Sequence, residues 1–209
     1  MRIQRISGGD EGEFAGLVRV YEASLAASER KSLAALNAML ARPEYLFLAA
    51  VEDGSVLGFA IAIALIGSDA ALLEYMAVDV GLRGRGVGAA LFGAVAGWSG
   101  IADRSLLVEV DSEREGSVER EQRARRKEFY RRLGARELEG LRYLMPPVTA
   151  AAPPAMDLMV YRRELPGYIE KGRVRGWLED CYKQVYGVAA GDPRVGEMLV
   201  GRGEWIPLV

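Results

Sequence analysis

The sequence predicts an α/β protein of the α+β type, with a central mixed, mostly antiparallel sheet and an extra C-terminal helix. Half of the 209 residues are apolar and 27% are charged, which is typical of a globular chain and excludes a disordered or collagen-like one. Short apolar or alternating runs give about seven candidate strands. Apolar residues at helical spacing occur before, between and after these runs.

The N-terminal part is predicted to be one strand and two helices. Alternation over residues 2–6 predicts the strand. Apolar residues recur at helical spacing over residues 11–27, which predicts the first helix. The second helix is expected over residues 32–41 and ends before Pro43, because proline disfavours helix in the residue before it.

A meander of three strands is predicted next, over residues 45–51, 56–66 and 72–78. The pair Asp53-Gly54 between the first two is typical of a two-residue hairpin turn. Strands joined by such turns are antiparallel, so this part of the sheet is expected to be antiparallel.

The following segment alternates between helical and strand patterns. Its expected elements are a helix over 89–98, a strand over 106–110, a helix in the second half of 112–136, and strands over 141–144 and 156–161. Gly134 is expected to end the second of these helices.

The last predicted element is an amphipathic helix after Gly167. Its apolar stripe has the spacing i, i+3, i+4 and consists of Val174, Trp177, Leu178, Cys181, Tyr182 and Val185. We expect a main domain over residues 1–165. A helical extension over residues 166–209 then packs on that domain or on a partner subunit, with a homodimer as one option.

Composition excludes several classes of function. The chain has no histidine, which excludes Ser-His-Asp hydrolases, Cys-His proteases and His-ligated zinc sites. The net charge of −2 argues against nucleic-acid binding. With Cys181 as the single cysteine no intrachain disulfide can form, so a cytoplasmic setting is expected. No signal peptide, membrane span or metal site is expected.

A Gly/Arg loop over residues 79–88 is the segment that indicates a ligand-binding site most directly. Glycines allow the backbone to approach a ligand closely, and the loop precedes a predicted helix whose N-terminal N–H groups favour an anion. The loop lacks the Walker lysine pattern, and it only approaches the dinucleotide pattern G-x-G-x-x-G. The alternatives are a pyrophosphate site or a surface loop that only caps the helix.

This loop resembles the Q/R-x-x-G-x-G/A signature of the GNAT superfamily of N-acetyltransferases, in the run Arg83-Gly84-Arg85-Gly86-Val87-Gly88. The similarity extends upstream through residues 73–78 and downstream to Phe129-Tyr130-Arg131-Arg132-Leu133-Gly134, which looks like the family's F-Y-x-x-x-G segment. It covers about four-fifths of the chain and leaves out the C-terminal helix.

The resemblance implies acetyl-CoA as co-substrate, bound in a cleft between two splayed central strands. The backbone of Met76, Ala77 and Val78 would then pair with the pantetheine arm. The amides of Arg83, Gly84, Arg85, Gly86, Val87 and Gly88 would hold the pyrophosphate, and Tyr130 would lie near the sulfur. The implied reaction is direct transfer of the acetyl group to a primary amine of a small molecule or a peptide.

The chemistry needs a group that takes a proton from the amine and one that protonates the leaving thiolate. Glu74 is the first candidate for the amine, because in a strand it shares a face with Met76 and Val78; an ion-pair role is the alternative. Glu109 and Asp111, on the neighbouring strand, are weaker candidates. Tyr130 suits the thiolate, since a phenol with a pKa of about 10 stays protonated at neutral pH.

In this family the acceptor is selected by the first two helices, the loop between the last two strands of the sheet and any extension. Here that implies the segment Ser28-Glu29-Arg30-Lys31, the Pro-rich loop over 146–154 and the helix after Gly167. Glu29 is a candidate for an acceptor's amine and Arg30 for its carboxylate. Two other classes stay open: a non-catalytic acyl-CoA-binding or sensing module, and a dinucleotide-binding oxidoreductase.

Overall fold

The computed structural model describes residues 1–114, 120–147 and 153–209. The chain divides into two compact units. The first comprises Met1–Ala64 and Leu73–Ala102, and the second comprises Leu65–Leu72 and Asp103–Val209. The predicted boundary at residue 165 stays a prediction.

The first unit contains the N-terminal helices and the meander. Its elements are β1 (Arg2–Arg5), α1 (Glu11–Ser24), the 3-10 turn η1 (Ala27–Glu29), α2 (Leu33–Leu40), β2 (Tyr45–Glu52), β3 (Ser55–Ala64), the later part of β4 (Ala70–Val78), the 3-10 turn η2 (Val80–Leu82) and α3 (Val87–Ala96). The strand order is β1-β2-β3-β4, and β2 pairs antiparallel with both β1 and β3. The predicted meander is confirmed.

The hairpin between β2 and β3 follows from its turn residues. Asp53 and Gly54 have φ of 49° and 74°, the left-handed backbone that a two-residue hairpin turn requires. A bulge interrupts the register, since Ala50 pairs with Gly58 whereas Val51 pairs with Val56. The extra residue reverses the faces of β3, so Val56 lies against α1 while Gly58 lies toward α3.

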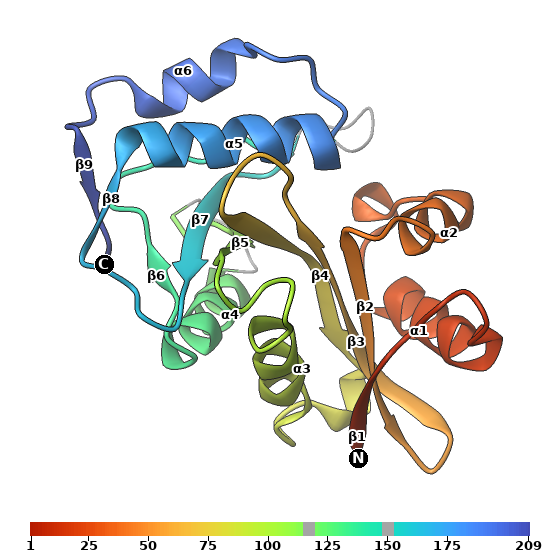
Figure 1. The fold of residues 1–209 in the computed structure, drawn as a ribbon. Coiled ribbons are helices and arrows are strands. Elements are labelled where there is room, and N and C mark those ends of the chain that lie inside the picture. The colour runs from red at the N-terminus through yellow and green to blue at the C-terminus, as the bar shows by residue number, and fades with distance from the viewer. Residues whose placement is uncertain (115–119, 148–152) are drawn as a thin grey trace. The chain divides into compact units, whose positions relative to one another are not determined.

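Helices cover both faces of this part of the sheet, with α1 and α2 on one side and α3 on the other (Figure 1). Ser32 caps α2 by accepting a hydrogen bond of 3.2 Å from the Ala35 N–H, as a serine at that position favours. Each helix buries its apolar stripe: Leu17 in α1, Leu36 in α2 and Leu91 in α3 are all at most 1% exposed. Removing such surface from water stabilises the unit.

The second unit contains the remaining strands and the C-terminal helices. Its elements are β5 (Ser105–Asp111), α4 (Arg120–Arg132), β6 (Arg136–Glu137), β7 (Met156–Tyr161), β8 (Tyr168–Glu170), α5 (Lys171–Val185), α6 (Pro193–Leu199) and β9 (Trp205–Pro207). β7 lies between β5 and β6 and is antiparallel to both. The first residues of β4 belong to this unit, and the order of the seven-stranded sheet is β1-β2-β3-β4-β5-β7-β6.

The predicted strand over residues 141–144 is wrong. The sixth strand is Arg136–Glu137, and Tyr143 keeps a single bridge, to Met156. Leu141 and Tyr143 are buried, at 1% and 2% exposed, which accounts for the alternating pattern. Their segment packs by its side chains, and the Leu144 N–H is directed at the Met198 sulfur at 3.2 Å rather than at a strand.

The C-terminal helix is confirmed. All six residues of its predicted stripe are buried in α5. Asp69 fixes this helix by accepting hydrogen bonds from Arg173 and from the Trp177 indole, the latter at 2.9 Å. The elements β8, α6 and β9 were not predicted, because three-residue strands and a seven-residue helix are too short for a periodic pattern.

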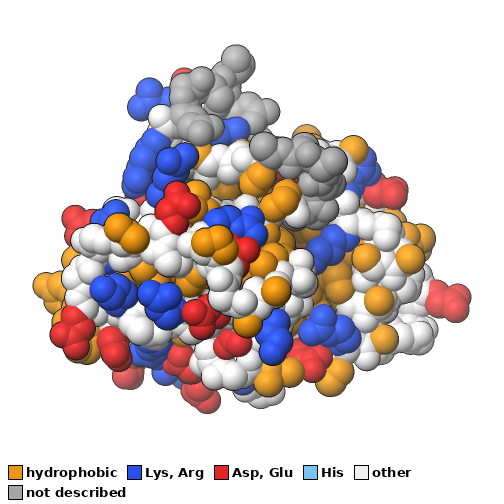
Figure 2. All heavy atoms as spheres, turned by 90° about the horizontal axis from the view of Figure 1, so that it is seen from above, with side chains coloured by type: hydrophobic (Ala, Val, Ile, Leu, Met, Phe, Trp, Pro, Cys, Tyr) orange, Lys and Arg blue, Asp and Glu red, His pale blue; other side chains and the backbone are white. Residues whose placement is uncertain are grey.

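None of the described helices combines the length and the apolar character that crossing a membrane requires. On the face drawn in Figure 2, positive and negative side chains are interspersed. This mixture agrees with the near-zero net charge.

Candidate functional site

The end of β4 differs from its beginning. The first four residues, Ala70–Leu73, are buried, whereas the last five, Glu74–Val78, are only half-buried. Backbone in the middle of a sheet is ordinarily covered, so this stretch is accessible in a way that β2 and β3 are not. It is the stretch that the family resemblance implies would pair with the pantetheine arm.

Gly58 brings β3 unusually close to this stretch. A Cβ atom at residue 58 would lie 2.8 Å from the Ala77 carbonyl oxygen, 3.2 Å from the Val78 Cα and 3.3 Å from a methyl of Leu91. The Asp79 N–H donates to the Leu57 carbonyl at 2.9 Å at the same level. The main chain of β3 therefore packs closely against the main chain of β4 at Ala77 and Val78.

The Gly/Arg loop has the backbone that the sequence predicts. Gly84 and Gly86 both have φ of 81°, with no neighbouring atom within 4 Å of an added Cβ. Gly86 is the N-cap of α3 and no side chain caps the helix. The first N–H groups of α3 thus have no intrahelical partner.

The surroundings of that helix end favour an anion. The first turn of α3 contains no acidic residue, and Arg83 and Arg85 are exposed beside it. The helix begins at Val87, two residues before its predicted start, so Val87 and Gly88 provide first-turn amides. Orphan amides, a helix N-terminus and two arginines form a donor set that fits a pyrophosphate.

Glu74 forms a charged contact within the first unit. Its side chain is 5% exposed and pairs with the ammonium group of Lys31, whose side chain is 18% exposed. The other carboxylate oxygen accepts a hydrogen bond of 3.1 Å from the Tyr45 hydroxyl. The sequence did not indicate Lys31 as the partner, since the two residues are 43 positions apart.

The segment that carries Lys31 is fixed on both sides. The Lys31 N–H donates to the Tyr21 hydroxyl at 2.7 Å, and the Tyr75 hydroxyl donates to the Glu29 carbonyl at 3.3 Å. The Tyr21 and Tyr75 rings pack edge to face with their centroids 5.2 Å apart. Burial raises the pKa of Tyr21, which keeps this phenol protonated.

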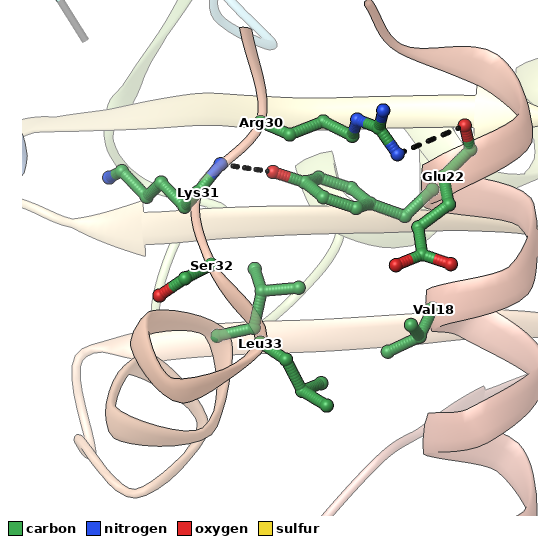
Figure 3. A pocket seen from close by; sticks show the side chains of 8 residues that line it. Val18, Glu22, Arg30, Lys31, Ser32 and Leu33 are labelled. Carbon is green, nitrogen blue, oxygen red and sulfur yellow. Dashed lines mark hydrogen bonds between the residues drawn. The ribbon is translucent and has the colours of Figure 1, made fainter. Parts of the chain in front are cut away.

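A pocket of about 170 Å³ lies beside this segment, between α1 and α2 (Figure 3). Arg30 lines it and donates a hydrogen bond of 3.4 Å to the Glu22 carbonyl. Its remaining lining is partly apolar and partly polar: Val18, Tyr21, Glu22, Lys31, Ser32, Leu33 and Leu36. Of the two predicted acceptor-binding residues, Arg30 therefore reaches the pocket, whereas Glu29 does not line it.

Tyr130 belongs to the second unit, in α4. It is 7% exposed, and its ring packs edge to face on Phe129 with 5.1 Å between centroids. Burial raises the pKa of Tyr130 to about 12, against a smaller opposing effect of the Arg126 charge. The phenol is thus protonated over the physiological pH range.

Glu109 anchors a cluster that the sequence did not reveal. One carboxylate oxygen accepts from the Tyr143 hydroxyl and the other accepts from the Tyr186 hydroxyl at 2.6 Å. The Cys181 sulfur lies 3.9 Å from the first oxygen. Asp111, the other weaker candidate, pairs with Arg126 at 2.6 Å. Tyr143 and Tyr186 come from segments with no motif, so only the fold brings them to Glu109.

Several charged side chains of α4 form ion pairs with carboxylates outside the helix, among them Arg126 with Asp111 and Arg131 with Glu137. Lys127 is fully buried and contacts Glu113 at 2.6 Å, Glu137 at 3.1 Å and Asp157. Residues 115–119 of this region and 148–152 of the Pro-rich loop lie outside the described residues. Across the described residues no cluster of three or more potential metal ligands occurs.

Comparison with known proteins agrees with this geometry. Residues 43–134 match the model of an acetyltransferase (GNAT) domain. No curated protein sequence matches the chain significantly. Among solved structures, one of a protein assigned to the GNAT acetyltransferases, from Bacteroides thetaiotaomicron, is 22% identical, with a TM-score of 0.73 over 90% of this chain and 100% of that one.

Two further structures share the fold. An aminoglycoside 6'-N-acetyltransferase in complex with coenzyme A is 17% identical, with a TM-score of 0.61, over 79% of this chain and 99% of that one. The ribosomal-protein-S18-alanine N-acetyltransferase from Escherichia coli is 20% identical, with a TM-score of 0.56, over 79% of this chain and 96% of that one. At these identities the comparison supports a common fold.

Proposed function

We propose that this chain, whose residues 43–134 match the model of an acetyltransferase (GNAT) domain, transfers the acetyl group of acetyl-CoA directly to a primary amine of a small molecule or peptide. The observation that supports this most strongly is the joint arrangement of β4, the Gly/Arg loop and α3. The half-buried residues Met76–Val78 lead, through the Gly/Arg loop, to the N-terminus of α3, whose first N–H groups have no intrahelical partner.

In this proposal the loop binds the coenzyme. Amides from Arg83 to Gly88 hold the two phosphates, and the side chains of Arg83 and Arg85 add charge at the same place. The backbone of Met76, Ala77 and Val78 pairs with the pantetheine arm. A strand N–H there also supplies a donor to the thioester oxygen as negative charge develops on it.

The amine must lose a proton before it attacks, since a free alkylamine has a pKa of about 10. We assign this proton to Glu74, whose carboxylate already holds the ammonium group of Lys31. Tyr45 keeps the carboxylate in one orientation. Glu109 is the alternative proton acceptor, a carboxylate on β5 that accepts hydrogen bonds from Tyr143 and Tyr186.

The leaving thiolate must gain a proton, and Tyr130 is assigned that role. Its raised pKa keeps the proton on the phenol until the thiolate forms. Cys181 is not assigned a covalent role, because it is 2% exposed on the apolar stripe of α5. The proposal also places the protein in the cytoplasm, where its single thiol stays reduced.

A ligand screen tests the proposal. Acetyl-CoA should raise the melting temperature and NAD should not, because only a ligand of the folded state stabilises it. An acceptor screen that reports thiol release should then find amines that accelerate release. Stabilisation by acetyl-CoA without any amine-dependent release would favour the non-catalytic acyl-CoA module, and stabilisation by NAD alone would favour the oxidoreductase.

A further inference from the structure

Lys31 presents a primary amine to the carboxylate that is proposed to receive the acceptor's proton. The chain has four lysines, at positions 31, 127, 171 and 183, and Lys31 is the one in the first unit. Its ammonium group and Glu74 form a contact that is mostly shielded from water. Lys31 and Glu74 thus supply the same two groups, a primary amine and a carboxylate, that an acceptor amine and its proton acceptor would supply.

Hydrogen bonds to the backbone hold the segment that carries Lys31 in one conformation. Tyr21 binds the Lys31 N–H, and Tyr75 binds the carbonyl of Glu29 two residues earlier. Lys31 lies between η1 and α2, a connection that would otherwise be mobile. Tyr21, which is buried, and Tyr75, which is half-buried, therefore order the backbone that carries the Lys31 side chain.

We propose that Lys31 is acetylated by the chain's own transferase site when no better acceptor is present. The inference rests on the proposed function, since it takes acetyl-CoA as the donor. Glu74 accepts a proton from the Lys31 ammonium group, and the neutral Nζ attacks the thioester carbonyl carbon. A C–N bond forms, the C–S bond breaks, and the thiolate leaves as CoA with one proton.

Strand geometry supports the reach of this reaction. Glu74 and Met76 are on the same face of β4, and Cα atoms two residues apart in a strand are about 6.8 Å apart. Met76 begins the backbone assigned to the pantetheine arm. An amine at the Glu74 carboxylate therefore lies on the face of β4 where that backbone begins, and side-chain rotation would bring it toward the acetyl end of the arm.

Acetylation would change the site in a defined way. The Lys31 ammonium group becomes a neutral amide, which removes the cation from a carboxylate that is 5% exposed. A true acceptor competes for the same carboxylate. We therefore expect acceptor amines to slow the modification of Lys31.

The test is incubation of the purified full chain with acetyl-CoA alone, followed by peptide mass spectrometry. We expect a mass increase of one acetyl group on Lys31, at a rate independent of protein concentration. Lys183 is the matched control: it is exposed on α5 and reports uncatalysed acetylation by the thioester. Lys31, being shielded, would be modified more slowly than Lys183 if the chemistry were uncatalysed.

Two variants complete the test. Glu74→Gln should lower the rate at Lys31 at least tenfold and leave the rate at Lys183 unchanged. Lys31→Arg should remove the modification and keep thermal stabilisation by acetyl-CoA, which shows that the variant is folded. A chain that binds acetyl-CoA and acetylates an added amine, yet leaves Lys31 unmodified, overturns this inference alone. A chain that acetyl-CoA does not stabilise overturns the proposed function as well.

Discussion

Tyr45 donates a hydrogen bond of 3.1 Å to Glu74 across the width of β3, from the first residue of β2 to the middle of β4. Lys31 occupies the other carboxylate oxygen. The carboxylate is thus held in one orientation by two strands and a connecting segment. This arrangement fixes the carboxylate before any ligand binds, as the proposed role of Glu74 as proton acceptor requires.

Glu74→Gln should lower kcat/KM by about 100-fold, because a positioned proton acceptor contributes a factor of that order. The amide keeps the size of the side chain and can still accept from Tyr45. The change should leave the affinity for acetyl-CoA within about twofold, as measured by calorimetric titration, since the phosphates are assigned to the loop.

Glu109→Gln is the matched comparison. It removes one negative charge from β5, and the new amide can still contact the hydroxyls of Tyr143 and Tyr186. If Glu109→Gln proves the more damaging of the two in steady-state kinetics, the proton acceptor is Glu109 and the assignment of Glu74 is wrong.

Gly86→Ala should weaken acetyl-CoA binding about tenfold, which corresponds to about 1.4 kcal/mol. Alanine disfavours the left-handed φ of 81°, so the N-terminus of α3 must shift and its amides lose their common direction. Titration calorimetry of the two proteins would measure the difference.

Gly54→Ala controls for the backbone cost. Gly54 has a φ of 74° and equally open surroundings, but it lies in the β2–β3 turn. Both variants should lose about 1 kcal/mol of unfolding free energy. Equal acetyl-CoA affinity in the two would remove the loop from the binding site.

These local conformations were predictable because their cause is local. A left-handed Asp-Gly turn, a glycine that starts α3 and the Gly134 that ends α4 each depend on a few neighbouring residues. The same holds for the six-residue stripe of α5. The strand expected at residues 141–144 failed because alternating burial there comes from side-chain packing, and the pattern alone does not distinguish the two.

Tyr130→Phe should lower kcat by about 100-fold or more and change the KM for acetyl-CoA much less, because the ring stays and only the proton donor is lost. In the wild type, no loss of activity on the alkaline side should trace to this phenol below about pH 11, since its pKa is about 12. Stopped-flow detection of CoA release across pH would measure both. An unchanged kcat would remove Tyr130 from the acid role.

Lys127→Met should lower the unfolding free energy by about 3–5 kcal/mol, because Glu137 and Asp157 are 2% exposed and would be left without their buried cation. Urea unfolding measures this loss. Lys183→Met, on an exposed part of α5, should stay within about 0.5 kcal/mol of the wild type.

The same cluster should make stability depend on pH. Burial opposes the charge of Glu113, but its hydrogen bonds, the one with Lys127 first among them, and the charges of Lys127 and Arg131 together outweigh this and lower the pKa of the carboxyl below 4.5. A lowered pKa in the folded state contributes stability above the unfolded value, and this stability is lost as the pH falls. The melting temperature should therefore decline below about pH 4.5, and by less in Lys127→Met.

Arg30→Ala should raise the KM of an acceptor that carries a carboxylate by about tenfold and spare an acceptor without one, because the guanidinium lines the pocket between α1 and α2. Glu29→Ala should affect acceptors less, as Glu29 does not line that pocket. Kinetics with paired acceptors that differ only in the carboxylate would decide this. Equal effects of Arg30→Ala on both acceptors would exclude the contact.

The partners in the site were beyond the reach of sequence patterns. Lys31 meets Glu74 across 43 positions, and Tyr186 meets Glu109 across 77. Lys127 had the appearance of one more surface charge in a basic helix, and its burial depends on carboxylates from β6, β7 and the residues after β5. Such pairings follow from strand order, which no single segment encodes.

Gly58 touches no proposed ligand, yet it sets the spacing between β3 and the end of β4. Any larger residue there would press on the carbonyl of Ala77 from the rear and tilt the peptide planes at Ala77 and Val78. Coenzyme affinity could then be tuned in small steps from a position hidden behind the binding surface. Mutational screens confined to the residues assigned to coenzyme contacts would leave Gly58 out.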